Sequence, residues 1–168
     1  DLEIDYNNRE GDRNLIKQVE NISTVSQIVE FSTMISTIEK KQNKTSFTRI
    51  KAIDQNYPLY GDVIFEPVGS LKKLNEIDNT ILVNENIFKN LNLKINDIVK
   101  VQNVKFKVIG VVKVLPDIGG AFVFGDFALT GKKTLDKLEL NTLGSFLNYE
   151  YKIKSVSYTH LRAHETNL

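Results

Sequence analysis

The two histidines are the residues of this chain that would most directly support metal binding or catalysis. His160 and His164 are four positions apart, so on a helix both would point the same way and could hold zinc. Two ligands without a cysteine or a well-placed carboxylate nearby make only half of a zinc site. Because the rest of the sequence has no histidine, a serine triad would lack its base, and we expect no catalytic residue and no metal site.

A segment between Gly125 and Thr134 resembles a phosphate-binding loop but lacks its spacing. The pattern requires a glycine five positions before Gly131, where Asp126 stands, and a Ser or Thr where Lys133 stands. We therefore expect no bound nucleotide or other cofactor in this domain. The acidic residues fall mainly on the polar phase of the predicted strands and helices, which favours solvated faces over a hydrolytic carboxylate pair.

Length and charge limit the classes of protein that remain. The chain has 168 residues, no cysteine and a formal net charge of +1. This length suits one domain, or two small lobes that share a core. A nearly neutral chain has no overall field that would attract nucleic acid, so we expect no nucleic-acid partner. The lack of cysteine excludes disulfides but fits either redox compartment.

Both ends of the sequence have the character of artificial boundaries. The chain opens at Asp1 with neither Met nor a signal peptide, as if cut from a longer protein. Residues 155–168, which include the run from Ser157 to Thr166, resemble a translated sequencing adapter from metagenomic assembly. We therefore leave this tail out of functional reasoning and expect a fold that is incomplete at its C-terminus.

Hydrophobic alternation predicts the elements that would position functional residues. Residues 1–6 alternate as a strand, and residues 12–20 have helical spacing behind a capping Asp12. Residues 25–38 and 45–54 alternate as two long strands joined by a polar turn, which predicts a hairpin. The next predictions are a strand at 63–65, a polar connection over 66–79, a short strand at 81–83 and a helix at 85–91. Residues 93–101 turn into a strand, and its hairpin partner begins at residue 104 and ends in a loop at Pro116. One or two short strands over 122–129, a helical turn at 134–138 and a strand at 146–154 complete the pattern.

A break in the middle of the chain is predicted to act as a hinge between two lobes. Pro58 moves the preceding residue out of the helical region, and Gly61 allows a bend. The predicted hinge consists of Tyr57, Pro58, Leu59, Tyr60 and Gly61.

Two further local signals concern a turn and a contact surface. Asn96 tolerates a left-handed backbone better than any residue except glycine, so it can form the turn that leads into the strand that ends at residue 101. Phe122 and Phe124 follow a glycine pair and could contact a partner, although aromatic residues of strands more often pack in a core.

The Tyr57–Gly61 block, which follows the Lys-Ala-Ile-Asp end of a strand, resembles a motif of one transporter family. That family is the extracytoplasmic domain of MacB-like or FtsX-like ABC transporter permeases, and the YbbP-like branch is the most similar. Asn96 departs from the family pattern, which usually has glycine before Asp97. The resemblance extends over most of residues 1–154 and rests also on Phe31–Met34, Arg49–Asp54, Leu82–Val83, Leu91–Leu93, Phe106–Val112, Pro116–Asp117 and Gly144–Ser145.

The resemblance implies an α+β fold with two lobes. Residues 1–56 and a return strand at 146–154 would form a membrane-proximal lobe that contains βαβ units, and residues 57–145 would form a smaller, mainly β lobe inserted into it. It also implies a non-catalytic domain on the periplasmic or extracellular side of an inner-membrane permease.

The partners follow from the same resemblance. ATP would be bound by a separate ABC ATPase subunit, reached through membrane helices, and the full permease would form a dimer and contact a periplasmic protein. Motion of the domain would export or release a hydrophobic or lipid-linked substrate.

Two other classes of protein fit the residues without the resemblance. A soluble periplasmic binding or adaptor module predicts a self-sufficient fold, whereas a permease fragment predicts an unpaired sheet edge or a bare apolar face. A hydrolase that works through scattered carboxylates predicts acidic residues converging in one cleft.

Overall fold

A computed structural model describes residues 2–38, 42–116, 125–140 and 146–155. These residues form strands and helices in the following order: β1 Leu2–Asn7, α1 Arg13–Glu20, β2 Ser23–Thr37, β3 Thr45–Ile53, β4 Ile64–Glu66, α2 Ser70–Glu76, β5 Thr80–Asn84, α3 Glu85–Asn90, β6 Ile98–Val101, β7 Val104–Val114, β8 Phe127–Gly131, the 3-10 helix η2 Lys132–Lys137, and β9 Asn148–Ser155.

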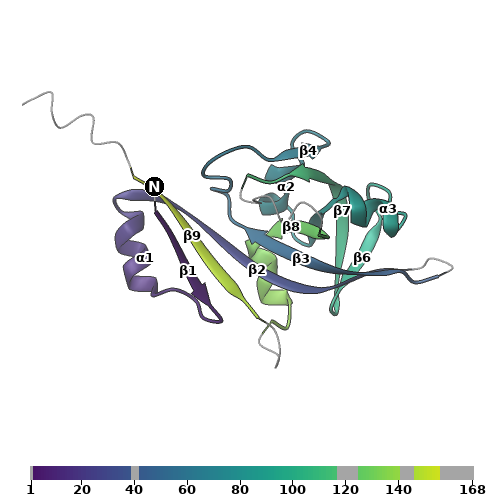
Figure 1. The fold of residues 1–168 in the computed structure, drawn as a ribbon, viewed down its shortest axis with the longest axis horizontal. Helices are drawn as coiled ribbons and strands as arrows, with labels where there is room; N and C mark the ends of the chain where they lie inside the picture. The colour runs from purple at the N-terminus through teal and green to yellow at the C-terminus, as the bar shows by residue number, and fades with distance from the viewer. Residues whose placement is uncertain (1, 39–41, 117–124, 141–145, 156–168) are drawn as a thin grey trace, which may run out of the picture.

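The strands form one mixed sheet, which confirms the predicted α+β class (Figure 1). Its order is β1-β9-β2-β3-β8-β5-β7-β4, and β6 pairs with both β2 and β7 outside that path. Strand β3 runs parallel to β8, and β5 runs parallel to β7. The other pairs are antiparallel.

The N-terminal part is a split βαβ unit. Strands β1 and β2 each pair antiparallel with β9, which lies between them. The predicted cap of α1 is confirmed, because an Asp12 carboxylate oxygen accepts the amide hydrogens of Asn14 and Leu15 at 2.8 and 3.3 Å. Ile16 and Val19 then cover Tyr151 on the sheet.

The β2–β3 hairpin connects two regions of the molecule. Its predicted bounds agree with β2 and β3 to within two residues. Near the start of β2 the hairpin pairs with β9, and near its end it pairs with β6. Phe31, Ile35 and Ile50 enter the main core together with buried side chains of residues 81–140. The division into lobes at residue 57 stays a prediction, and the hairpin shows that residues on both sides of it share one core.

The main error in the predicted elements lies at residues 66–79. The structure has α2 there instead of a polar connection. The helix has only two apolar side chains, and Leu74 is the one that is fully buried. Gly131 allows the close approach, since a Cβ at that position would collide with the carbonyl oxygen of Leu74. This contact lies far away in the sequence, so local periodicity could not indicate it.

Several shorter elements agree with expectation. Helix α3 and strands β4 and β5 lie within about a residue of their predicted positions, β6 occupies the end of the predicted segment 93–101, and η2 overlaps the helical turn predicted at 134–138. Asn96 has the left-handed backbone predicted for it, with φ at 76°. Strand β7 begins at Val104 and ends at Val114, which agrees with the strand predicted between the two-residue turn and Pro116. Strand β8 begins at Phe127 within the region predicted at 122–129, of which residues 122–124 lie outside the described residues.

Candidate functional site

The predicted hinge is held by contacts to two distant parts of the chain. Tyr57 is buried among Ile28, Ile53 and other side chains of a second core. The Tyr60 hydroxyl donates a hydrogen bond to the carbonyl oxygen of Ile153 in β9 at 3.2 Å. The Lys154 ammonium lies 5.5 Å from the centre of the Tyr60 ring, which is close enough for a cation–π contact.

The end of this segment packs against the residue that follows β7. Gly61 has φ at +68°, a conformation that glycine adopts without strain. A Cβ at this position would lie 2.5 Å from the Cβ of Pro116. The segment therefore lies where the chain from β3, the end of β7 and the end of β9 meet. Its role as a hinge stays a prediction.

The other predicted contact residues, Phe122 and Phe124, lie outside the described residues, as do His160 and His164. The described residues offer a different exposed surface, which the sequence analysis missed.

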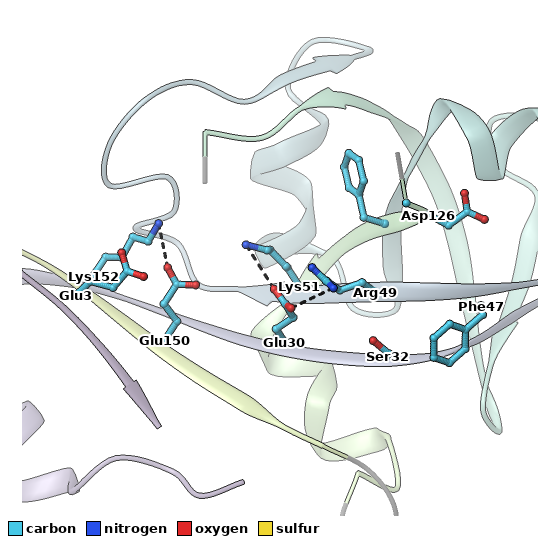
Figure 2. Close-up of a pocket in the computed structure, with 11 residues that line it drawn as sticks. Glu3, Glu30, Ser32, Phe47, Arg49, Lys51, Asp126, Glu150 and Lys152 are labelled. Carbon is cyan, nitrogen blue, oxygen red and sulfur yellow. Dashed lines mark ion pairs between the residues drawn. The ribbon is translucent and has the colours of Figure 1, made fainter. Parts of the chain in front are cut away.

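This surface is a charged groove on one face of the sheet, with a volume of about 480 Å³ (Figure 2). Glu30 of β2 forms ion pairs with Arg49 and Lys51 of β3, with N···O distances of 3.3 and 3.6 Å. In β9, Lys152 lies 3.0 Å from Glu150. Lys51 and Glu150 are largely buried, so these charges need their partners because burying an unpaired charge is costly.

Large apolar side chains stand exposed beside these ion pairs. Met34 and Phe47 face each other across β2 and β3 and are 45% and 67% exposed. Phe146, which lines a neighbouring hollow together with Phe47, is 79% exposed. Interfaces between proteins are enriched in such aromatic and Met side chains, so this rim is a candidate contact surface. We call the charged groove and this rim the open face.

A sequence signal for the open face did exist. Strand residues two apart share a face, so Phe47 lies in phase with Arg49 and Lys51 rather than with the buried Thr48 and Ile50. Phe47 is an apolar side chain on the charged, exposed face of β3 and does not face the core. Such a residue suggests contact with a molecule outside the domain.

Three carboxylates converge at one end of the groove. Oxygen atoms of Glu3, Asp5 and Glu150 lie within 4.8 Å of one another. Acidic residues therefore do meet in space, as the hydrolase alternative expects. The Lys152 ammonium, which pairs with Glu150, already supplies a positive charge to this group.

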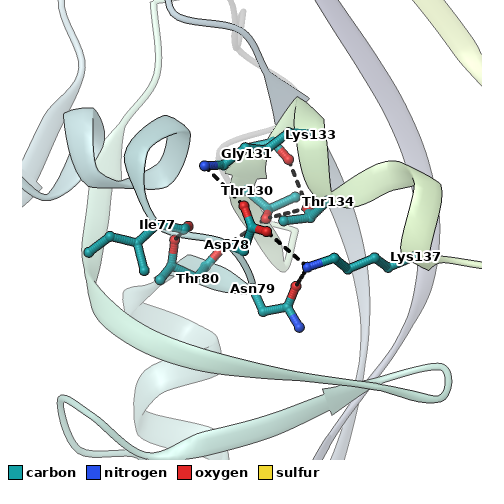
Figure 3. Close-up of polar contacts among 9 residues, drawn as sticks. All are labelled: Ile77, Asp78, Asn79, Thr80, Thr130, Gly131, Lys133, Thr134 and Lys137. Atoms are coloured by element: carbon teal, nitrogen blue, oxygen red, sulfur yellow. Dashed lines mark hydrogen bonds and ion pairs between the residues drawn. The ribbon is translucent and has the colours of Figure 1, made fainter.

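A second ion-pair group fastens η2 to the turn before β5 (Figure 3). The Asp78 carboxylate accepts hydrogen bonds from Lys133 and Lys137, each at 3.0 Å, and these bonds hold the pKa of Asp78 below its ordinary value. Behind it, the Thr130 hydroxyl donates to the carbonyl oxygen of Thr80 at 2.8 Å. The end of the segment that resembles a phosphate loop therefore holds η2 against the start of β5 through ion pairs and hydrogen bonds.

None of the described helices is both long and apolar enough to cross a bilayer.

The sequence of residues 4–159 matches the family of the MacB-like periplasmic core domain. The chain belongs to this family. The match covers most of the chain and reaches five residues into the predicted foreign tail, whose origin stays a prediction. No curated protein matches the chain.

Solved structures with the same fold agree with the family. The chain superposes on the extracellular domain of the noncanonic ABC-type transporter YknZ from Gram-positive bacteria with a TM-score of 0.55 and 11% identity, covering 89% of this chain and 74% of that one. It superposes on the periplasmic region of MacB from Actinobacillus actinomycetemcomitans with a TM-score of 0.53 and 15% identity, covering 88% and 67%. This MacB-like domain is thus homologous to extracytoplasmic domains of ABC transporter permeases.

Proposed function

We propose that this MacB-like domain is the extracytoplasmic part of an ABC export permease and acts by moving rather than by catalysis. ATP hydrolysis by a separate cytoplasmic ATPase would change the separation of the membrane helices on either side of the domain. The domain would convert that change into motion that exports or releases a hydrophobic or lipid-linked substrate.

The observation that carries the proposal is the pairing of β1 with β9. Leu2 at the start of β1 lies opposite Ile153 near the end of β9. The first and the last described strands therefore lie side by side at one edge of the sheet. A shift of one helix against the other would act directly on two hydrogen-bonded strands.

The predicted hinge lies next to these strands. Because Tyr60 is hydrogen-bonded to Ile153, a movement of β9 would reach the segment that leads to β4 and the rest of the domain. The open face would then meet a second copy of the permease or a periplasmic protein, because it combines exposed apolar side chains with ion pairs.

Pulsed electron–electron double resonance, which measures the distance between two spin labels, tests this proposal on the full permease with its ATPase in nanodiscs. Because this sequence has no cysteine, spin labels at Glu3→Cys in β1 and Lys105→Cys at the β6–β7 turn would be the only ones in this domain. Dilution with unlabelled permease removes distances between copies. We expect the distance distribution to differ between the nucleotide-free and the vanadate-trapped state.

A control pair at Lys105→Cys and Lys94→Cys, both in the inserted part, should keep one distribution in both states. If the ATPase is active and the first pair also keeps one distribution, the domain does not move with the ATPase cycle and the proposal is wrong.

A further inference from the structure

A second polar cleft, distinct from the open face, lies between the βαβ unit and η2. Its volume is about 800 Å³, and α1, β2, the end of β3, α2 and η2 all contribute to its lining. This volume lies within the range of about 300–1,000 Å³ that is usual for small-molecule sites. Nothing in the family match or in the transport proposal assigns a role to it.

Three side-chain amides line the cleft, and each donates one hydrogen bond through its NH2 group, which fixes its orientation. Gln27 Nε2 donates to the Tyr151 hydroxyl at 2.9 Å. Asn56 Nδ2 donates to the carbonyl oxygen of Val25 at 2.7 Å, and Asn75 Nδ2 donates to that of Asp54 at 2.9 Å. Within the described part of the chain, no group donates to the three amide oxygens. These fixed oxygens would accept hydrogen bonds from a ligand.

One ammonium group of the cleft supplies hydrogen-bond donors, whereas the amide oxygens are acceptors. Lys132 is half-buried in the cleft, and no described residue forms an ion pair or a hydrogen bond with it. Burial lowers the pKa of Lys132, while the nearby carboxylates, Asp54 foremost, act in the opposite direction. Its three N–H donors therefore remain for a ligand.

The charges around the cleft select the class of ligand. The lining carries four carboxylates, those of Glu10, Glu20, Asp54 and Asp136, and three cationic side chains, those of Arg13, Lys132 and Lys133. These charges nearly balance, so an anion meets the carboxylates and a cation meets the cationic side chains. A neutral molecule with many hydroxyl groups avoids both repulsions. Each hydroxyl can donate to an amide or carboxylate oxygen and can accept from the lysine.

We propose that this cleft binds a neutral saccharide, held by the oxygens of Gln27, Asn56 and Asn75 and by the ammonium of Lys132. The proposal is independent of the transport function, because a domain that does not move could still bind sugar. A saccharide in this position would contact both the βαβ unit and η2.

A nuclear magnetic resonance titration of the 15N-labelled 168-residue chain tests the proposal. The probes are maltose and N,N′-diacetylchitobiose as neutral saccharides, with putrescine as a cation and citrate as an anion. We expect saturable shifts for at least one saccharide in the side-chain amide signals of Gln27, Asn56 and Asn75. Putrescine and citrate should leave these signals unchanged.

Two lysine substitutions separate binding from folding. Lys132→Met should weaken saccharide binding about tenfold, the effect of losing a hydrogen bond from a charged donor. Lys137→Met is the matched control on the same helix, because Lys137 does not line the cleft and its ammonium pairs with Asp78 (Figure 3). This variant should bind as the wild type does.

Three results would overturn the proposal. They are the absence of saturable shifts with either saccharide, shifts that map to other residues, and equal affinity of wild type and Lys132→Met when both give folded spectra.

Discussion

The hydroxyl of Tyr60 and the carbonyl oxygen of Ile153 join the predicted hinge to β9 through a hydrogen bond of 3.2 Å. The two residues lie 93 positions apart, so the bond connects the segment after β3 to the strand that completes the βαβ unit. If β9 moves during transport, this bond and the contact between Lys154 and the Tyr60 ring would transmit the movement to the hinge segment.

Removal of this bond should lower stability modestly. Tyr60→Phe deletes the hydroxyl and keeps the ring, so we expect the free energy of unfolding in urea to fall by about 1 kcal/mol. Tyr6→Phe is the control, because no described residue forms a hydrogen bond with the Tyr6 hydroxyl while its ring packs edge-on against Tyr151. Equal losses in the two variants would show that the Tyr60 bond contributes nothing specific.

Three glycine substitutions should separate backbone strain from steric collision. Gly125→Ala should be nearly neutral, since a Cβ there meets no atom within 4 Å and its backbone is not left-handed. Gly69→Ala adds strain alone, because φ is +85° and the space is empty, and should cost about 1 kcal/mol. Gly61→Ala adds the contact with Pro116 and should cost more than Gly69→Ala in thermal or urea unfolding. The reverse order of Gly61 and Gly69 would contradict the close packing of the hinge against Pro116.

The rim of the open face should matter for association rather than for folding. Phe47→Ser should change the free energy of unfolding by no more than about 0.5 kcal/mol, because the ring is mostly exposed. In the full permease it should weaken the contact with the second copy or the periplasmic partner, as measured by crosslinking yield in membranes. Phe106→Ser, a change of a fully buried ring, is the contrasting variant and should unfold the domain. An unchanged crosslinking yield for Phe47→Ser would exclude the rim from the interface.

The Asp78 group should give stability a defined dependence on pH. The folded-state pKa of Asp78 is lowered by Lys133 and Lys137, so its contribution is fully present above the ordinary aspartate pKa of about 4 and is lost as the pH falls through the folded value. Wild type should therefore exceed Asp78→Asn in thermal midpoint near pH 7, and the two should converge as the pH falls below the ordinary aspartate pKa and through the lowered folded-state pKa. Because the group is exposed, 1 M salt should shrink the difference at pH 7. A difference that persists at low pH would show that the carboxylate charge is not its cause.

Much of the fold was predictable from short stretches of sequence. The β2–β3 hairpin follows from the alternation of apolar and polar residues, because successive strand residues face opposite sides of a sheet. The start of α1 follows from Asp12, whose carboxylate can satisfy amide hydrogens of the first turn. The left-handed backbone at Asn96 follows from the tolerance of asparagine for this conformation. Each of these signals acts between residues that are close in the chain.

The strand order of the βαβ unit and the position of helix α2 depend on contacts between residues that are far apart in the sequence. The position of β9 between β1 and β2 and the anchoring of Gly11 by the Tyr151 hydroxyl, 140 positions away, have no local signature. The sequence does not predict helix α2, because its one fully buried apolar side chain, Leu74, is covered by residues far along the chain.

The two candidate sites show the same limit. The residue types of the open face are visible in the alternation of β2 and β3, but its groove exists only because β9 adds Glu150 and Lys152 beside them. The second cleft brings Lys132 to the amides of Gln27, Asn56 and Asn75, which lie on separate elements. Backbone preference and side-chain periodicity act over a few residues, whereas strand pairing and burial bring together residues from the whole chain.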